Sequence, residues 1–142
     1  MMIDWKRVLV AASLGAASSA FALGGLPPVE QSGDVRYVSG GVGQDESQAF
    51  LSRRAEFPLS IEIYANENGH EVYTADASVT VRDRSGDTVV QTQAQGPFVL
   101  VDAPPGRYSV EVTRAGKTQT KRATVRNGQT AREIFLFDAR SS

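Results

Sequence analysis

The chain has 142 residues, with 15 basic and 16 acidic side chains and a formal net charge of −1. This length suits a single domain with one core. Because the charge is nearly balanced, no global electrostatic attraction favours nucleic acid, and a nucleic-acid partner is not expected. Cysteine does not occur in the sequence, which excludes a disulfide framework and a cysteine-ligated metal site.

The N-terminal segment has the pattern of a secretory signal. Lys6-Arg7 precedes an apolar run over residues 8–12, and Ala20-Phe21-Ala22 places small residues at the two positions that signal peptidase reads. The run is shorter than the roughly 20 apolar residues of a membrane-spanning helix. We therefore expect residues 1–22 to be a cleaved signal peptide, with a retained anchor as the alternative. The mature chain, from Leu23, is expected in a bacterial periplasm without a stable membrane span.

Residues 23–57 are expected to form a Gly/Pro-rich leader followed by a short helix. Within the leader, Tyr37–Gly43 contains three glycines, which weaken both a regular helix and a central strand. The helix is expected over Asp45–Ala55, where Asp45 can cap the N-terminus with Gln48 as its reciprocal partner.

Apolar and polar residues alternate with a period of two after residue 58, which is typical of half-buried strands. The turn Pro104-Pro105-Gly106 leads into the clearest example, in which Tyr108, Val110 and Val112 share one side of the chain. Asn127-Gly128 is expected to be the turn of the last hairpin, because both residues tolerate positive φ. Strands are expected over residues 59–63, 77–81, 88–93, 98–101, 107–114, 118–126 and 130–137.

Short strands separated by turn residues favour an all-β, seven-stranded antiparallel Ig-like β-sandwich over residues 58–138, with an open barrel as the alternative. The alternation also predicts which side chains form the core. They are Ile61, Ile63, Val79, Val81, Val89, Phe98, Leu100, Tyr108, Val110, Val112, Ala123, Val125, Ile134 and Leu136.

Several pieces of the strand region match a known family. The most specific is Ala103-Pro104-Pro105-Gly106-Arg107-Tyr108-Ser109-Val110. The others are Ala77–Val81 with Asp83 and Gly86, then Thr92, Gly96–Leu100, Gly116 and Asn127-Gly128, although Gln93 stands where an acidic residue often follows the threonine. On these residues, positions 59–137 resemble the carboxypeptidase regulatory-like domain.

The resemblance carries expectations about fold and function. It implies a transthyretin-like (prealbumin-like) sandwich that is non-catalytic and accessory to other proteins. Related folds are classed with starch- and carbohydrate-binding domains, which makes glycan binding a second implication. The segment Tyr37–Glu46 also resembles an N-terminal extension of small exported bacterial proteins of this kind.

Few residues have the spacing that catalysis or metal binding requires. His70 is the only histidine, and the sequence contains neither a His-Glu-x-x-His motif nor a Gly-x-Ser-x-Gly elbow. The segment Asn66–Gly69, followed by Glu71, offers oxygen ligands but lacks the spaced Asp residues and the distal Glu of a calcium loop. We therefore expect a protein that is not an enzyme and that has no cofactor and no metal.

Basic residues are concentrated in the last three expected strands. The candidates for partner binding there are Arg107, Lys117, Lys121, Arg122 and Arg126. The favoured interpretation is that they protect an edge strand from aggregation. The alternative is that they present a basic face to an anionic partner. If the face docks a partner, charge reversal at Lys121 and Arg122 weakens the binding.

Four other side chains are candidates for recognition. Tyr37 and Val38 either contact a partner or belong to a strand that covers a sheet edge. Tyr64 and Tyr73 can stack on a sugar ring, although the only tryptophan, Trp5, lies in the signal segment. The leading function is therefore an exported, non-enzymatic accessory module that binds an unidentified protein or cell-envelope component. A carbohydrate-binding module is the alternative.

Overall fold

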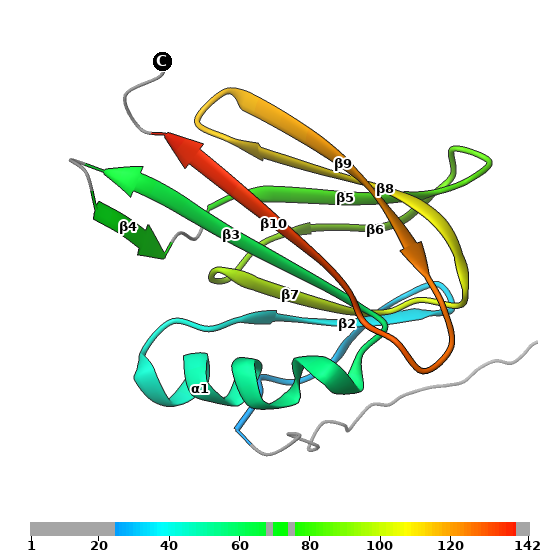
Figure 1. The fold of residues 1–142 in the computed structure, drawn as a ribbon, viewed down its shortest axis with the longest axis horizontal. Coiled ribbons are helices and arrows are strands. Elements are labelled where there is room, and N and C mark those ends of the chain that lie inside the picture. Colours follow the sequence, from blue (N-terminus) through cyan, green and yellow to red (C-terminus); the bar gives the residue numbers. More distant parts are fainter. Residues whose placement is uncertain (1–24, 68–69, 74–75, 139–142) are drawn as a thin grey trace, which may run out of the picture.

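The computed structural model describes residues 25–67, 70–73 and 76–138. These residues form ten strands in two sheets, together with one α-helix and one 3-10 turn (Figure 1). The chain is therefore mostly β and sandwich-like, as the alternating pattern indicates, whereas the expected number of seven strands is wrong. The signal peptide expected over residues 1–22 lies outside the described residues.

The larger sheet, sheet A, has the strand order β1-β2-β7-β3-β10, with β4 paired to the C-terminal half of β3. Its strands are β1 (Glu30–Ser32), β2 (Val35–Gly40), β3 (Leu59–Glu67), β4 (His70–Tyr73), β7 (Phe98–Asp102) and β10 (Ala131–Asp138). The expectation of a wholly antiparallel sandwich is wrong, because β10 runs parallel to β3.

The smaller sheet, sheet B, has the strand order β6-β5-β8-β9. Its strands are β5 (Ser78–Asp83), β6 (Thr88–Gln93), β8 (Gly106–Arg114) and β9 (Lys117–Val125). Strand β8 is interior and begins at the Pro-Pro-Gly turn. The buried Tyr108 closes this turn, since its hydroxyl donates a 2.6 Å hydrogen bond to the carbonyl of Pro104. The expected tight hairpin follows β8, with positive φ at Ala115 and Gly116 (51° and 79°).

Apolar side chains fill the space between the two sheets. Ile61 and Ile63 of β3, for example, are fully buried and belong to the same cluster as Val110 and Val112 of β8. Burial of such side chains contributes about 1.5–3 kcal/mol each. In β6 it is Val90, opposite Val81, that is fully buried, whereas Val89, expected in the core, is only half-buried.

A second apolar cluster lies on the outer face of sheet A. The helix α1 (Gln44–Arg53) lies beside β2 (Figure 1), and the 3-10 turn η4 (Arg54–Glu56) follows it. The ring of Phe50 stacks on Phe98 with centroids 5.3 Å apart. Phe98 and Leu100 are buried as expected, but they pack in this outer cluster rather than between the sheets, because they lie on the helix side of β7.

The start of α1 differs from the expected capping arrangement. Its N-cap is Gly43, which makes no side-chain cap, so the assignment of Asp45 as cap is wrong. Asp45 instead lies in the first turn, where the helix dipole favours a carboxylate. Glu46 turns back to accept a 2.7 Å hydrogen bond from the amide of Gly41, and this bond fixes the connection between β2 and α1.

The Gly-rich segment forms part of the sheet, contrary to the expectation that it is a poor central strand. Strand β2 lies between β1 and β7 and pairs with β7 along its length. The glycines are needed for close packing, because a Cβ on Gly41 would lie 2.4 Å from the ring of Phe98. The interpretation as a strand that packs onto the sheet therefore describes this segment.

The expected hairpin at Asn127-Gly128 is also wrong, because the strands on either side of it belong to different sheets. The chain crosses here from β9 of sheet B to β10 of sheet A. Two hydrogen bonds of 2.8 Å fix the crossing, from the Thr130 hydroxyl to the carbonyl of Phe57 and from the amide of Ala131 to the carbonyl of Pro58.

The side chains of β10 face opposite to the expected directions. Ile134 and Leu136, expected in the core, are 38% and 48% exposed, whereas Phe135 and Phe137 are buried between the sheets. The parallel register places Phe135 opposite Ile63, whose side chain points inward. Residues 134–137 are apolar in both alternating sets, so the period of two alone does not decide which set is buried.

This orientation predicts unequal costs for neighbouring truncations. Phe135→Ala is expected to lower the free energy of unfolding by about 3–5 kcal/mol, because it opens a cavity in the main core. Leu136→Ala is the matched control and is expected to cost less than about 1 kcal/mol, because the side chain is half exposed. Urea denaturation of the two variants measures both values. A larger loss for Leu136→Ala would contradict the orientation.

Candidate functional site

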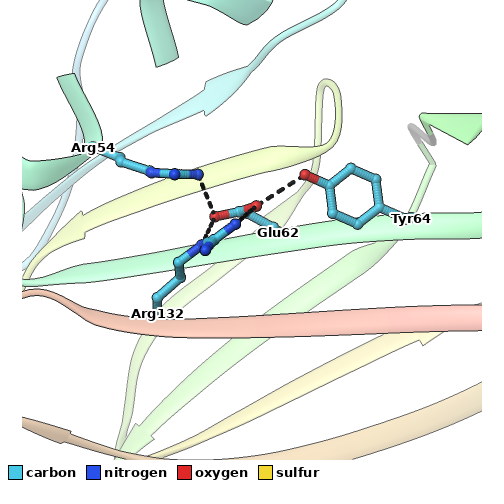
Figure 2. A network of polar contacts seen from close by, with 4 residues as sticks. All are labelled: Arg54, Glu62, Tyr64 and Arg132. Carbon is cyan, nitrogen blue, oxygen red and sulfur yellow. Dashed lines mark hydrogen bonds and ion pairs between the residues drawn. The ribbon is translucent and has the colours of Figure 1, made fainter. Parts of the chain in front are cut away.

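A fully buried carboxylate, Glu62, lies on the outer face of sheet A (Figure 2). The guanidinium of Arg132 contacts both of its oxygens, with Nε 2.6 Å from Oε2 and Nη2 3.0 Å from Oε1. Arg54 donates to Oε2 at 3.0 Å, and the hydroxyl of Tyr64 donates to Oε1 at 2.9 Å. The carboxylate thus has four donors from three side chains.

Three separate segments supply this network. Glu62 and Tyr64 belong to β3, Arg132 enters from the parallel neighbour β10, and Arg54 comes from η4. Burial raises the pKa of Glu62, but the hydrogen bonds from Arg132 and Tyr64 and the positive charges of both arginines outweigh it and hold the pKa below its usual range. The network therefore links η4 and β10 to β3, and its role is structural.

A different group of arginines lines a groove on sheet B. Arg84 follows β5 in the turn to β6, Arg107 lies at the start of β8, and Arg122 lies in β9. The groove has a volume of about 500 Å³. The residues that line it are Asp83, Arg84, Arg107, Tyr108, Ser109, Arg122, Ala123 and Thr124. We call it the arginine groove.

The register of sheet B brings these side chains together. Arg122 lies opposite Ser109, and Arg107 lies opposite Thr124, so the two arginines are diagonal neighbours across β8 and β9. Exposed and buried residues alternate along β8, and Arg107 is in the exposed set, opposite to the buried Tyr108. The two arginines thus lie on the outer face of sheet B.

The turn that presents Arg84 is rigidly held. Oδ1 of Asp83 accepts hydrogen bonds from the amides of Ser85 and Asp87 at 3.0 and 3.1 Å and from the Ser85 hydroxyl at 2.8 Å. The Ser85 hydroxyl bond, together with the backbone donors of the turn, lowers the pKa of Asp83. The carboxylate is therefore ionised, and one of its oxygens is directed into its own turn.

The arginine groove is positively charged, because three guanidinium groups and one carboxylate line it. Within the described residues, Arg84, Arg107 and Arg122 form no ion pair. Arg82, by contrast, is on the same sheet but pairs with Glu111 at 3.2 Å. The groove is therefore a place where an external anion finds unused donors.

The other basic residues predicted from the sequence do not join this face. Lys121 points to the opposite side of β9, where its ammonium lies 5.5 Å from the centroid of the Phe135 ring. Lys117 lies at the hairpin end of β9, and Arg126 lines a separate hollow beside the crossing to β10. The expectation of a single basic face is therefore wrong: adjacent residues of a strand alternate, and Lys121 and Arg122 face opposite ways.

Lys121 also supports the interpretation of edge protection. It is exposed on the side of β9 that faces β10, two strands at the edges of their sheets, and its charge acts on Glu133. Nearby, the side-chain amide of Gln119 donates a 2.8 Å hydrogen bond to the carbonyl of Leu136. A charged edge residue and an occupied carbonyl both discourage pairing with another strand.

The remaining candidates are less accessible than the sequence suggests. Val38 is fully buried in the cluster beneath α1, and Tyr37 packs partly against the main core. Tyr64 is half-buried, with its hydroxyl held by Glu62. The backbone of Tyr73 pairs with that of Tyr64, but the Tyr73 side chain lies outside the part of the chain that the structure describes.

Comparison with known proteins leaves the chain without an assigned family. No protein-family model matches it, and no curated protein is significantly similar to it. Among residues 25–67, 70–73 and 76–138, no group of acidic, histidine or cysteine side chains is arranged to hold a metal ion. In the same ranges no helix combines the length and hydropathy needed to cross a membrane.

The buried network predicts acid sensitivity with a definite sign. Because the folded-state pKa of Glu62 lies below the usual value of 4.5, the network stabilises the fold above that pH, and this stability is lost as pH falls through the folded pKa. Glu62→Gln is expected to lower stability at neutral pH by about 1–3 kcal/mol. It is also expected to flatten the loss of stability on acidification, as followed by urea titrations at several pH values.

Glu133 provides the control, because burial raises its pKa in the folded state. Its charge opposes folding as pH rises, so Glu133→Gln is expected to leave neutral-pH stability unchanged or higher. An equal loss of stability in the two variants would contradict the role of Glu62.

Proposed function

We propose that the protein is an exported, non-enzymatic accessory module that binds an anionic protein or cell-envelope component. The single observation that carries the proposal is the arginine groove, where Arg84, Arg107 and Arg122 converge without a matching set of carboxylates. Arg132 and Arg54, by contrast, are both paired with Glu62. Exposed guanidinium groups gathered in one groove favour an anionic partner.

The family resemblance supports the same class of function. A carboxypeptidase regulatory-like domain is an accessory beside other proteins, and the two-sheet architecture is compatible with that resemblance. In this proposal the secretory signal carries the chain to the periplasm. The partner then docks on the outer face of sheet B, since the outer face of sheet A beside β2 is already covered by α1.

Charge reversal in the groove is expected to abolish partner capture from envelope extract. The full chain is immobilised as wild type, as Arg107→Glu/Arg122→Glu, and as the charge-matched control Lys117→Glu/Arg126→Glu. We expect the groove variant alone to lose the captured component, because only its substitutions place carboxylates in the site. Binding by the wild type is expected to weaken with added salt, since exposed charges are screened.

Thermal unfolding of each variant checks the fold. Small changes in melting temperature are expected, because Arg107, Arg122 and Arg126 are exposed and Lys117 is half-buried at the hairpin end of β9. Equal capture by the groove variant and the control would contradict the proposal.

A further inference from the structure

We infer that the arginine groove recognises a phosphate monoester carried by a polar molecule such as a sugar phosphate. This inference rests on the proposed function, and it names the chemical class that the site accepts. It draws on the donor set of the groove, on the fixed position of Asp83 and on the polarity of the surrounding sheet face.

The donor set fits a dianionic tetrahedral group. Arg107 and Arg122 present planar guanidinium forks from neighbouring strands, and such forks match phosphate oxygens with two parallel hydrogen bonds. Arg84, in the turn after β5, adds a third cation to the lining. A phosphate monoester carries about two negative charges at neutral pH, so it is better balanced by three guanidinium groups than a single carboxylate is.

Neutral donors accompany the charges. Ser109 and Thr124 line the same groove, each directly opposite one of the two arginines in the β8–β9 register. Hydroxyl groups donate to phosphate oxygens and also exchange hydrogen bonds with sugar hydroxyls. The groove can therefore contact both the charged phosphate and the polar group to which the phosphate is esterified.

Within the described residues, Asp83 forms no ion pair with the arginines of the groove. Its Oδ1 accepts three hydrogen bonds from the turn Ser85–Asp87, so the carboxylate is held by its own turn. Asp83 also contributes the one negative charge among the lining residues. A ligand with a single negative charge would leave the groove with a positive excess, which favours a doubly charged group.

The surroundings favour a polar carrier over a lipid bilayer. The apolar lining residues, Tyr108 and Ala123, are 7% and 3% exposed and belong to the core between the sheets. Beyond the groove, the outer face of β9 continues with exposed Thr118 and Thr120. Adsorption to membranes is usually strengthened by apolar side chains that enter the bilayer, and the described lining of the groove presents none.

The test uses the isotopically labelled full chain, with amide chemical shifts followed by NMR. Glucose 6-phosphate is the probe, and glucose is its neutral counterpart. We expect glucose 6-phosphate to shift the amides of Arg107, Ser109, Arg122 and Thr124, while glucose leaves them unchanged. Equal effects of the two sugars, or shifts confined to other strands, would overturn the inference.

Two double variants separate fork recognition from simple charge attraction. Arg107→Lys/Arg122→Lys keeps the charge but removes the planar forks, and it is expected to weaken glucose 6-phosphate binding at least about tenfold. Lys117→Gln/Arg126→Gln removes two charges outside the groove and is expected to leave the affinity unchanged. Wild-type affinity in the lysine variant, or a matching loss in the glutamine variant, would overturn the inference.

A binding experiment with lipid vesicles distinguishes a phosphate on a soluble sugar from a phosphate in a lipid headgroup. We expect no sedimentation with phosphatidylglycerol or phosphatidylcholine vesicles at physiological ionic strength. Sedimentation with the anionic vesicles, without a response to glucose 6-phosphate, would overturn the inference in favour of a lipid headgroup. If every phosphate probe fails while envelope capture still depends on Arg107 and Arg122, the inference fails and the proposed function stands. If that capture is also independent of them, both fail.

Discussion

The parallel pairing of β10 with β3 is the constraint on which the rest of the structure depends. It requires the chain to leave sheet B after Val125 and to cross to sheet A, where Ala131 meets Leu59. The same register turns Phe135 and Phe137 inward and brings Arg132 to the buried Glu62. Core closure and the buried ion network are thus consequences of one pairing.

The arginines of this domain serve two different physical purposes. Arg132 and Arg54 form ion pairs with the carboxylate of Glu62. Because Glu62 is fully buried, these pairs replace the water that would otherwise solvate its charge. Arg107 and Arg122, by contrast, are exposed on a polar sheet face, where water can solvate them. The contrast explains why the same residue type is structural on sheet A and a candidate for recognition on sheet B.

Much of the fold could be predicted from local pattern, because strands and tight turns are encoded within a few residues. Tyr108 and its neighbours alternate clearly, and the Ala115-Gly116 turn was recognisable from the glycine. The side chains of β10 could not be oriented in this way, since Ile134-Phe135-Leu136-Phe137 is apolar on both faces. Only the long-range pairing with β3 determines which of these side chains are buried.

The candidate site was predictable in part. Arg107 and Arg122 were identifiable as exposed members of alternating strands, but Lys121 was grouped with them although it faces the other way. Arg84 was missed because it lies in an acidic part of the chain, far from them in sequence. The pairing of Asp83 in β5 with Tyr108 in β8 brings the neighbouring Arg84 to the groove. No local sequence pattern encodes that pairing.

The order in which the strands are synthesised gives the pairing of β3 with β10 a further consequence. A polypeptide leaves the ribosome N-terminus first, and the partner of β3 is the last strand of the described chain. One side of β3 therefore remains without its neighbour until almost the whole domain has emerged. Contacts so distant in sequence slow folding, because a long loop must close before they form. The pairing of β3 with β10 is therefore expected to be among the last contacts to form as the domain folds.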